Sequence, residues 1–266
     1  MQAQPPRTVY KSNTLVTAIF KLNVNEFRLF ILLLAEIDQR EVISTEEFIT
    51  LDISSFAERF GLDRHYAYAE VKKACQELVV KKYNIPASFI YPGEPVDELI
   101  DSTWLEACKF NDNTKTVVVR FGQTTADLIS SLDGNLGFIS YKLENAHNLK
   151  SFYSLRLFEL FLIGVKPDSE KKIRYTVEKF KTMLLLEGKC ELYGHFKANV
   201  LAPALKDVNE HTDLIVNIVD EVREGKKIVA IEFNVKRVKP IKQYSNDMSV
   251  LHKMQFKKST GIDVDV

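Results

Sequence analysis

The sequence predicts a helix-rich α+β protein with two tandem winged-helix domains. Two stretches, 53–78 and 175–208, each combine a short apolar-periodic helix, a break, and a longer helix with one apolar and one basic, aromatic face. Each stretch follows a strongly apolar helix and precedes strand-like sequence, which is the order of a winged helix. The chain has 266 residues, enough for two domains of ordinary size. We place the first domain at 1–135, the second at 136–238, and a basic tail at 239–266, which we expect to be disordered.

The first predicted helix begins after Asn23, whose side chain can accept a hydrogen bond from the first turn. Glu26, three residues on, completes a capping box, and Leu22 can pack against Phe27 as a hydrophobic staple. Beyond the cap, apolar residues recur at helical spacing as far as Ile37.

Two further helices form the first predicted helix-turn-helix. The shorter one begins at Asp52 and ends at Gly61, a residue type that often terminates helices. Asp63 caps the longer one, whose apolar residues recur at intervals of four, three and four. These apolar residues are Ala67, Val71, Ala74 and Leu78.

Beyond Asn84 the pattern favours strands. Segments 88–91, 103–110 and 115–121 are expected strands, separated by turn-forming sequence. The last two would present an exposed edge to a second chain. A short helix is expected at 124–132, the glycines Gly134 and Gly137 mark the domain boundary, and a strand at 138–143 opens the second half.

The second half repeats this order. An apolar helix is expected from 148 to 165, and Thr176 caps the next helix, with Tyr175 placed to staple onto Phe180. Strands 214–222 and 228–235 are expected to close the domain as a hairpin with a basic tip.

A longer helix is expected from Tyr193, with one apolar face. Pro203 lies inside it and removes a backbone hydrogen bond to Asn199, so we expect a kink or a division of the helix there. Aligning the two halves places Tyr68 opposite Tyr193 and Lys72 opposite Lys197.

Composition excludes several classes of protein. The apolar content of 45 % is that of a globular chain, and no apolar run is long enough to span a bilayer. The N-terminus lacks the apolar region of a secretion signal. The three cysteines, at 75, 108 and 190, have no metal-site spacing and fit a reducing cytosol. We therefore expect a cytoplasmic protein.

The formal net charge is zero, but the charges are unevenly distributed. Acidic residues dominate segment 94–112, and basic residues dominate segment 236–258. A neutral total therefore hides a basic surface of the kind that binds nucleic acid.

The outward residues of the longer helices are the candidate DNA contacts, because the second helix of a helix-turn-helix lies in the major groove. Arginine can bond a guanine edge twice, asparagine can do the same with adenine, and lysine or tyrosine can hold phosphates. The first module offers Arg64, His65, Tyr68 and Lys72; the second offers His195, Lys197, Asn199 and Lys206, with Arg223, Lys226 and Lys227 at its hairpin tip. The plainer interpretation is a solvated helix face, which Glu70 and Glu77 favour in the first module.

No catalytic constellation is evident, and we expect no enzyme activity, cofactor or metal. The five histidines are scattered, the glycines form no phosphate-binding loop, and no CxxC motif occurs.

Three segments carry a resemblance to a known family. These are "LNVNEFRLF" at 22–30, "SFYSLRLFEL" at 151–160 and, most specifically, "GHFKANVLAPALKDVNEHTDL" at 194–214. They resemble the plasmid replication initiators of the RepA/RepB/RepE type, which have two winged-helix domains. The similarity runs from about residue 9 to residue 238.

The resemblance implies a function and partners. Such proteins bind double-stranded DNA repeats, the iterons, at a plasmid origin as monomers, and recruit the host initiator and helicase. As homodimers joined through the first domain, they repress their own promoter and so control copy number. They act in the bacterial cytoplasm and are not enzymes. The main contacts would come from the second domain, here His195, Lys197 and Asn199, and the first domain would add auxiliary contacts. The family often has arginine near these positions, so base preference stays open.

Two alternatives remain at the level of sequence. One is a transcriptional repressor with the same modules and no initiation role. The other is a DNA-processing enzyme such as a nickase or primase, which the absence of paired metal-ligand histidines opposes.

Overall fold

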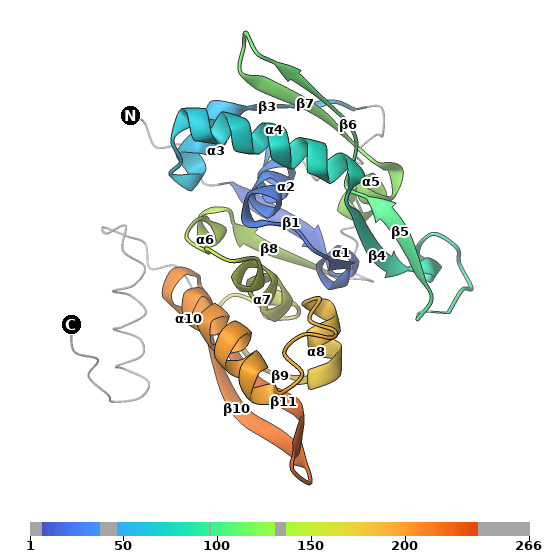
Figure 1. The fold of residues 1–266 in the computed structure, drawn as a ribbon, viewed down its shortest axis with the longest axis vertical. Helices are drawn as coiled ribbons and strands as arrows, with labels where there is room; N and C mark the ends of the chain where they lie inside the picture. The colour runs from blue at the N-terminus through green and yellow to red at the C-terminus, as the bar shows by residue number, and fades with distance from the viewer. Residues whose placement is uncertain (1–6, 38–46, 96, 131–136, 239–266) are drawn as a thin grey trace, which may run out of the picture. The chain divides into compact units, whose positions relative to one another are not determined.

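The computed structural model describes residues 7–37, 47–95, 97–130 and 137–238 (Figure 1). The predicted tail at 239–266 and Gly134 lie outside these residues. The chain forms two compact units, one of Met1–Asn148 with Thr182–Leu185, the other of Leu149–Lys181 with Leu186–Val266. Each combines helices with small antiparallel sheets, as the predicted fold class requires.

The described residues of the first unit form three small sheets, of strand order β1-β8, β2-β4-β5 and β3-β7-β6. Its elements in chain order are β1 (Thr8–Ser12), α1 (Asn13–Thr17), β2 (Ile19–Phe20), α2 (Val24–Glu36), β3 (Ile49–Asp52), α3 (Ile53–Phe60), α4 (Arg64–Val80), β4 (Lys82–Pro86), the 3-10 turn η1 (Ala87–Phe89), β5 (Leu99–Thr103), β6 (Leu105–Asn111), β7 (Thr116–Phe121), α5 (Gln123–Ser130), β8 (Phe138–Lys142) and α6 (Glu144–His147).

The helices of this unit begin and end where local sequence predicts. Asn23 and Glu26 form the expected capping box on α2, with the Glu26 carboxylate accepting from the Asn23 backbone at 2.8 Å. Asp52 caps α3, Gly61 ends it with φ +62, and Asp63 caps α4. These signals are local, so the chain needs no distant partner to obey them.

The strand predictions need two corrections. Segment 88–91 is not a strand, because the strand β4 precedes it and Pro86 leads into the turn η1. The segment predicted at 115–121 is not an edge, because β7 pairs with β3 on one side and β6 on the other. In the sheet that the structure describes, β3 and β6 are the edge strands.

The strand β8 belongs to the first unit rather than opening the second. It pairs antiparallel with β1, so that Thr8 lies opposite Lys142 and Ser12 opposite Phe138. The division between units therefore falls after Asn148, not at 135/136. The pairing joins residues near the two ends of the first unit, a contact that the local sequence does not show.

The core of the first unit is built around Trp104. This side chain is fully buried, and the rings of Phe20, Phe30 and Tyr83 lie 4.8, 4.6 and 4.5 Å away between centroids. The aromatic cluster joins β2, α2 and β4, and so fixes the apolar helix that supports α3 and α4.

The second unit has one three-stranded sheet of order β10-β11-β9, and β9 was not predicted. Its apolar helix is shorter than the expected 148–165, because Ser151 caps it by accepting from the backbone of Ser154 at 2.9 Å. The elements are α7 (Phe152–Leu162), β9 (Glu170–Thr176), α8 (Val177–Met183), α9 (Tyr193–Phe196), the π turn η2 (Lys197–Leu201), α10 (Ala202–His211), β10 (Leu214–Glu224) and β11 (Lys227–Arg237).

An aromatic cluster also forms the core of the second unit. The ring of Phe180 stacks on Tyr175 at 4.9 Å, as the staple predicts, and meets Phe196 edge-on at 6.1 Å. Phe233 from β11 lies 4.9 Å from Phe161 of α7 and 5.7 Å from Phe180. Through Phe196 this cluster positions the helix whose outer face carries the candidate DNA contacts.

Candidate nucleic-acid interface

The turn between α3 and α4 is fixed by two polar caps and one glycine. Gly61 takes the left-handed conformation that ends α3. The Asp63 carboxylate then accepts from the backbone of His65 at 2.9 Å and of Tyr66 at 3.1 Å. Backbone hydrogen bonds, that of Tyr66 foremost, lower the pKa of Asp63 although its slight desolvation opposes them. The first turn of α4 therefore has a defined direction, with Arg64 and His65 exposed.

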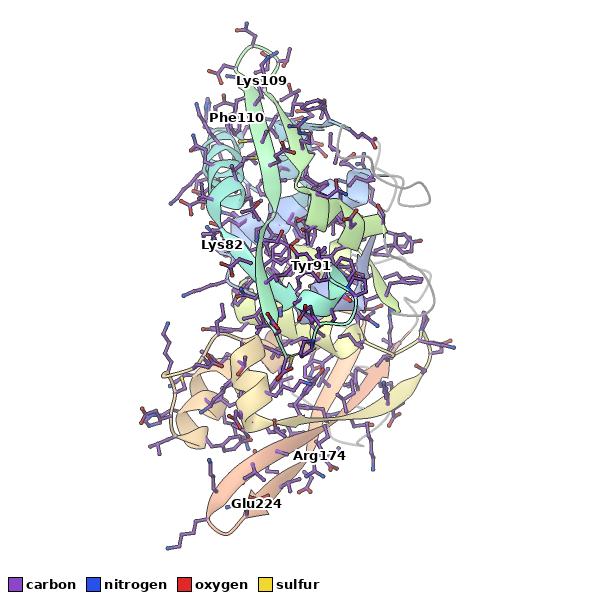
Figure 2. All side chains as sticks on the ribbon, turned by 90° about the vertical axis from the view of Figure 1, so that its right-hand side faces the viewer. Lys82, Tyr91, Lys109, Phe110, Arg174 and Glu224 are labelled. Atoms are coloured by element: carbon purple, nitrogen blue, oxygen red, sulfur yellow. The ribbon has the colours of Figure 1, made fainter. Side chains whose placement is uncertain are left out.

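The four residues predicted on the outer face of α4 have different environments. Arg64 is 78 % exposed and its Nη2 lies 3.8 Å from a carboxylate oxygen of Glu58. His65 and Lys72 are exposed, and the Lys72 Nζ lies 5.7 Å from the ring centre of Phe110, which Figure 2 labels on β6 near its hairpin end. Tyr68 is only partly exposed, and its hydroxyl donates to the Asp112 carboxylate. That hydroxyl is therefore already engaged within the protein.

A hollow of about 330 Å³ lies between the start of α3, the start of α4 and the β6–β7 turn. Its basic lining residues bring positive charge to one place, while Asp63 adds a carboxylate at the same helix end. The first unit thus offers a mixed rather than a strongly basic surface. The lining residues are Ile53, Ser54, Arg64, His65, Tyr68 and Lys115.

The second helix-turn-helix ends in a continuous helical segment, 193–211, made of α9, η2 and α10. Pro203 was expected to kink or divide this helix. In the structure a π turn separates α9 from α10, and in it the Ala202 N–H donates to the Lys197 carbonyl, five residues back. Backbone angles stay helical through Leu201 and Ala202, so the chain absorbs Pro203 without leaving the helix.

One face of this segment is buried and the opposite face is exposed. Phe196 and Val208 are wholly buried, whereas His195, Asn199 and Lys206 are exposed. Lys206 lies 3.8 Å from Glu210 in an exposed pair, a type of contact that stabilises little. His195 and Asn199, four residues apart, share the outward face and are available to a ligand.

Lys197 is less free than its position in the sequence predicts. Its Nζ lies 2.7 Å from Oε1 of Glu221, on β10, and the lysine side chain is 44 % exposed. The same carboxylate oxygen accepts a hydrogen bond from the Tyr193 hydroxyl. Glu221 therefore joins the hairpin to the helix through two side chains spaced four residues apart.

The ionisation of these groups follows from their contacts. Burial on its own would raise the pKa of Glu221, but hydrogen bonds from Lys197 and Tyr193, with the charge of Arg223, outweigh it and lower that pKa. Burial, followed by the bond to Glu221, raises the pKa of the Tyr193 hydroxyl. Both shifts favour an ionised Glu221 carboxylate facing a neutral Tyr193 phenol at neutral pH.

The β10–β11 hairpin carries the remaining candidates at its tip. Gly225, with φ +59, opens the two-residue turn, and Glu224 is labelled beside it in Figure 2. All three predicted basic residues of the tip are exposed. They are Arg223, Lys226 and Lys227.

Each unit contains an internal tyrosine–carboxylate contact that was not predicted from the sequence. In the first unit the Tyr68 hydroxyl donates to Asp112, and the charge of Lys72 helps to lower the pKa of Asp112 after that hydrogen bond. In the second, Tyr193 and Lys197 meet Glu221. Each long helix thus directs a tyrosine toward a carboxylate of the following hairpin, and in the second unit the lysine four residues later meets the same carboxylate. The Tyr-x-x-x-Lys spacing is visible in the sequence, but its acidic partners are not.

The described part of the chain lacks two kinds of feature. No helix there is long and apolar enough to cross a membrane. Among the same residues, no three or more histidine, cysteine or acidic side chains group as metal ligands.

Family models match both units. The model described as "Initiator Replication protein, WH1" matches residues 8–162, and the one described as "Initiator Rep protein, WH2" matches residues 176–235. Together they cover most of the described chain and agree with its two winged-helix units.

Two individual proteins show the same relationship. A replication initiation protein of Escherichia coli is 23 % identical over 210 residues, which is 77 % of this chain but only 63 % of that protein's length. The solved structure of Pi initiator protein in complex with iteron DNA superposes with a TM-score of 0.77 at 20 % identity, covering 88 % of this chain and 99 % of that one. The second likeness shows a common fold.

Proposed function

Because the chain belongs to the Initiator Replication protein family, we propose that it initiates plasmid replication by binding DNA repeats at an origin. The carrying observation is the exposed face of 193–211, where His195 and Asn199 stand outward from a helix anchored by the buried Phe196. The Pi initiator protein, which shares the fold, is seen with iteron DNA, and this supports repeats of that kind as the ligand.

The second unit is proposed as the main reader of sequence. Asn199 offers an amide that can bond adenine twice, and His195 stands one turn before it on the same face. The basic residues of the hairpin tip, Lys226 and Lys227, would hold the DNA backbone. Lys206 would add a phosphate contact farther along the helix.

The first unit is proposed to make auxiliary DNA contacts and to join two chains. Arg64, His65 and Lys72 offer exposed donors, but neighbouring carboxylates at Glu58 and Asp63 weaken the basic field. The edge strand β6 offers unpaired backbone groups to a second copy. A dimer formed there would act as a repressor of the chain's own promoter, and the monomer would bind the origin and recruit the host initiator and helicase.

A replication assay tests this proposal. A plasmid without any other origin would carry this gene and its flanking DNA, and its retention under selection would be measured. We expect retention only when both the gene and direct repeats of about two helical turns are intact, about 20 base pairs. A stop codon early in the gene and a scrambled repeat array serve as controls.

The other outcomes favour other functions. Loss of replication in a suitable host with intact repression of the promoter would favour a plain transcriptional repressor. Cleavage of a strand in the presence of a divalent metal would favour a DNA-processing enzyme.

A further inference from the structure

We propose that Glu221 sets the DNA discrimination of the second unit, by holding Lys197 and Tyr193 in an internal contact that non-specific DNA does not displace. This inference rests on the proposed DNA-binding function and concerns the same face of the molecule. It assigns a role to an acidic residue, in a place where the sequence predicts only basic contacts.

The geometry makes this contact specific rather than incidental. Oε1 of Glu221 receives both the Tyr193 hydroxyl and the Lys197 ammonium group, the latter at 2.7 Å. The strand β10 is irregular on both sides of Glu221, with register shifts between Ile218 and Asp220 and between Val222 and Arg223. Bulges of this kind re-aim side chains, and here they flank the residue that meets the helix.

The energetic consequence follows from charge. DNA binding at any sequence is driven largely by basic groups that replace counterions on phosphates. A lysine already neutralised by a carboxylate replaces none, and the carboxylate itself repels the backbone. The half-exposed Lys197 would therefore contribute to binding only where other contacts are good enough to separate it from Glu221. Such a contact weakens binding to random sequence more than binding to the correct site.

The first unit contains a tyrosine–carboxylate contact at the corresponding place on its long helix, which argues against chance. Tyr68 donates to Asp112, and Lys72 lies where its charge favours the ionised form of that carboxylate. The two carboxylates come from different positions of their hairpins, one from the β6–β7 turn and one from within β10. Both units thus hold the tyrosine of a Tyr-x-x-x-Lys segment against a carboxylate of the following hairpin, and in the second unit the lysine contacts that carboxylate as well.

The test compares full-length wild-type protein with Glu221→Gln, which keeps the side-chain shape and an oxygen to accept from Tyr193. Two probes are used: a random 30-base-pair duplex, and a duplex enriched from a random library by repeated selection with wild-type protein. Affinities are measured between 50 and 200 mM salt. Glu224→Gln, at the exposed hairpin tip, is the matched control, because it removes the same charge from the same hairpin. Lys197→Ala, alone and with Glu221→Gln, identifies the group through which Glu221 acts.

We expect Glu221→Gln to bind the random duplex about threefold or more tighter at 50 mM salt, with a smaller gain on the selected duplex. One additional phosphate contact makes the slope of log affinity against log salt steeper by about 0.9, or about 3.5-fold over this fourfold range of salt. The steepening should be absent in the Lys197→Ala background and absent in Glu224→Gln.

Three results would overturn the inference. Glu221→Gln could match wild type or Glu224→Gln in slope and selectivity. It could weaken binding to both duplexes without steepening the slope, which would show that Glu221 only supports the fold. Finally, wild-type protein could bind neither duplex nor enrich any sequence, and that result alone would remove the proposed function as well.

Discussion

Replacing Phe196 by alanine should destabilise the second unit and leave the stability of the first unit unchanged. The Phe196 side chain is fully buried, and the rings of Phe180 and Tyr193 lie 6.1 and 6.3 Å away between centroids. Truncation of a buried phenylalanine costs about 3–5 kcal/mol, from lost transfer free energy and the cavity left behind. We expect a loss of about 4 kcal/mol in the free energy of unfolding, because two aromatic contacts are lost together.

The chain's single tryptophan allows the two units to be followed separately. Trp104 is fully buried in the first unit, so its fluorescence reports on that core, whereas far-UV circular dichroism reports on both. In urea, the circular dichroism of Phe196→Ala should show the second unit unfolding at a midpoint about 2 M lower than in the wild type. The midpoint of the tryptophan fluorescence transition, which reports on the first unit, should not change. Leu78→Ala, buried in α4, is the converse control and should move the fluorescence transition. An equal shift of both signals in Phe196→Ala, or a midpoint change below about 0.5 M, would refute two separate cores.

Three other predictions follow from particular contacts. Gly61→Ala forces a side chain into φ +62 and should cost about 1 kcal/mol in thermal unfolding, and Gly61→Asn less; equal stability of all three would contradict this. Glu26→Ala removes the carboxylate 2.7 Å from the Lys81 ammonium group and the capping-box hydrogen bond to the Asn23 backbone, while Glu77 still lies 3.5 Å from Lys81. Together the two losses should cost about 3 kcal/mol by tryptophan fluorescence in urea, a value that a loss under 1 kcal/mol would disprove. A hydrogen bond from Cys75 lowers the pKa of the Cys108 thiol to about 7 against the opposing effect of burial. Because the thiolate is the nucleophile, alkylation of Cys108, followed by peptide mass spectrometry, should accelerate as pH rises through about 7. In Cys75→Ala the rise should move to higher pH, and an unchanged profile would show that Cys75 is not the cause.

Helices were predictable because their signals lie within a few residues. The capping box at Asn23, the glycine at 61 and the caps at Asp52 and Asp63 each act through neighbouring backbone groups. The pairing of strands was not predictable in this way, because partners can be far apart in the sequence. The strands β1 and β8, for example, pair although most of the first unit's sequence lies between them. The strand β9 was not predicted for the same reason. Its segment carries mainly charged residues, and its extended conformation depends on pairing with β11.

The sequence predicted which helix residues of the candidate interface are buried and which are exposed, but not the contacts that the exposed residues make with the hairpin. Helical periodicity correctly separates the buried Phe196 from the exposed His195 and Asn199. It cannot show that Lys197 faces Glu221, because that contact depends on the bulges of β10 and on the position of the hairpin. The contact of Tyr68 with Asp112 was not predictable for the same reason, since Asp112 belongs to a turn far along the chain.

If the helical segment 193–211 reads DNA sequence, selection from a random duplex library will reveal which bases it prefers. Wild-type protein and Asn199→Ala would be used to enrich bound sequences under identical salt, and their base preferences compared position by position. We predict that Asn199→Ala loses the preference for adenine at one position, a discrimination of about 1–3 kcal/mol, and keeps the preferences at the other positions of the site. Identical preferences for the two proteins at every position would contradict the claim.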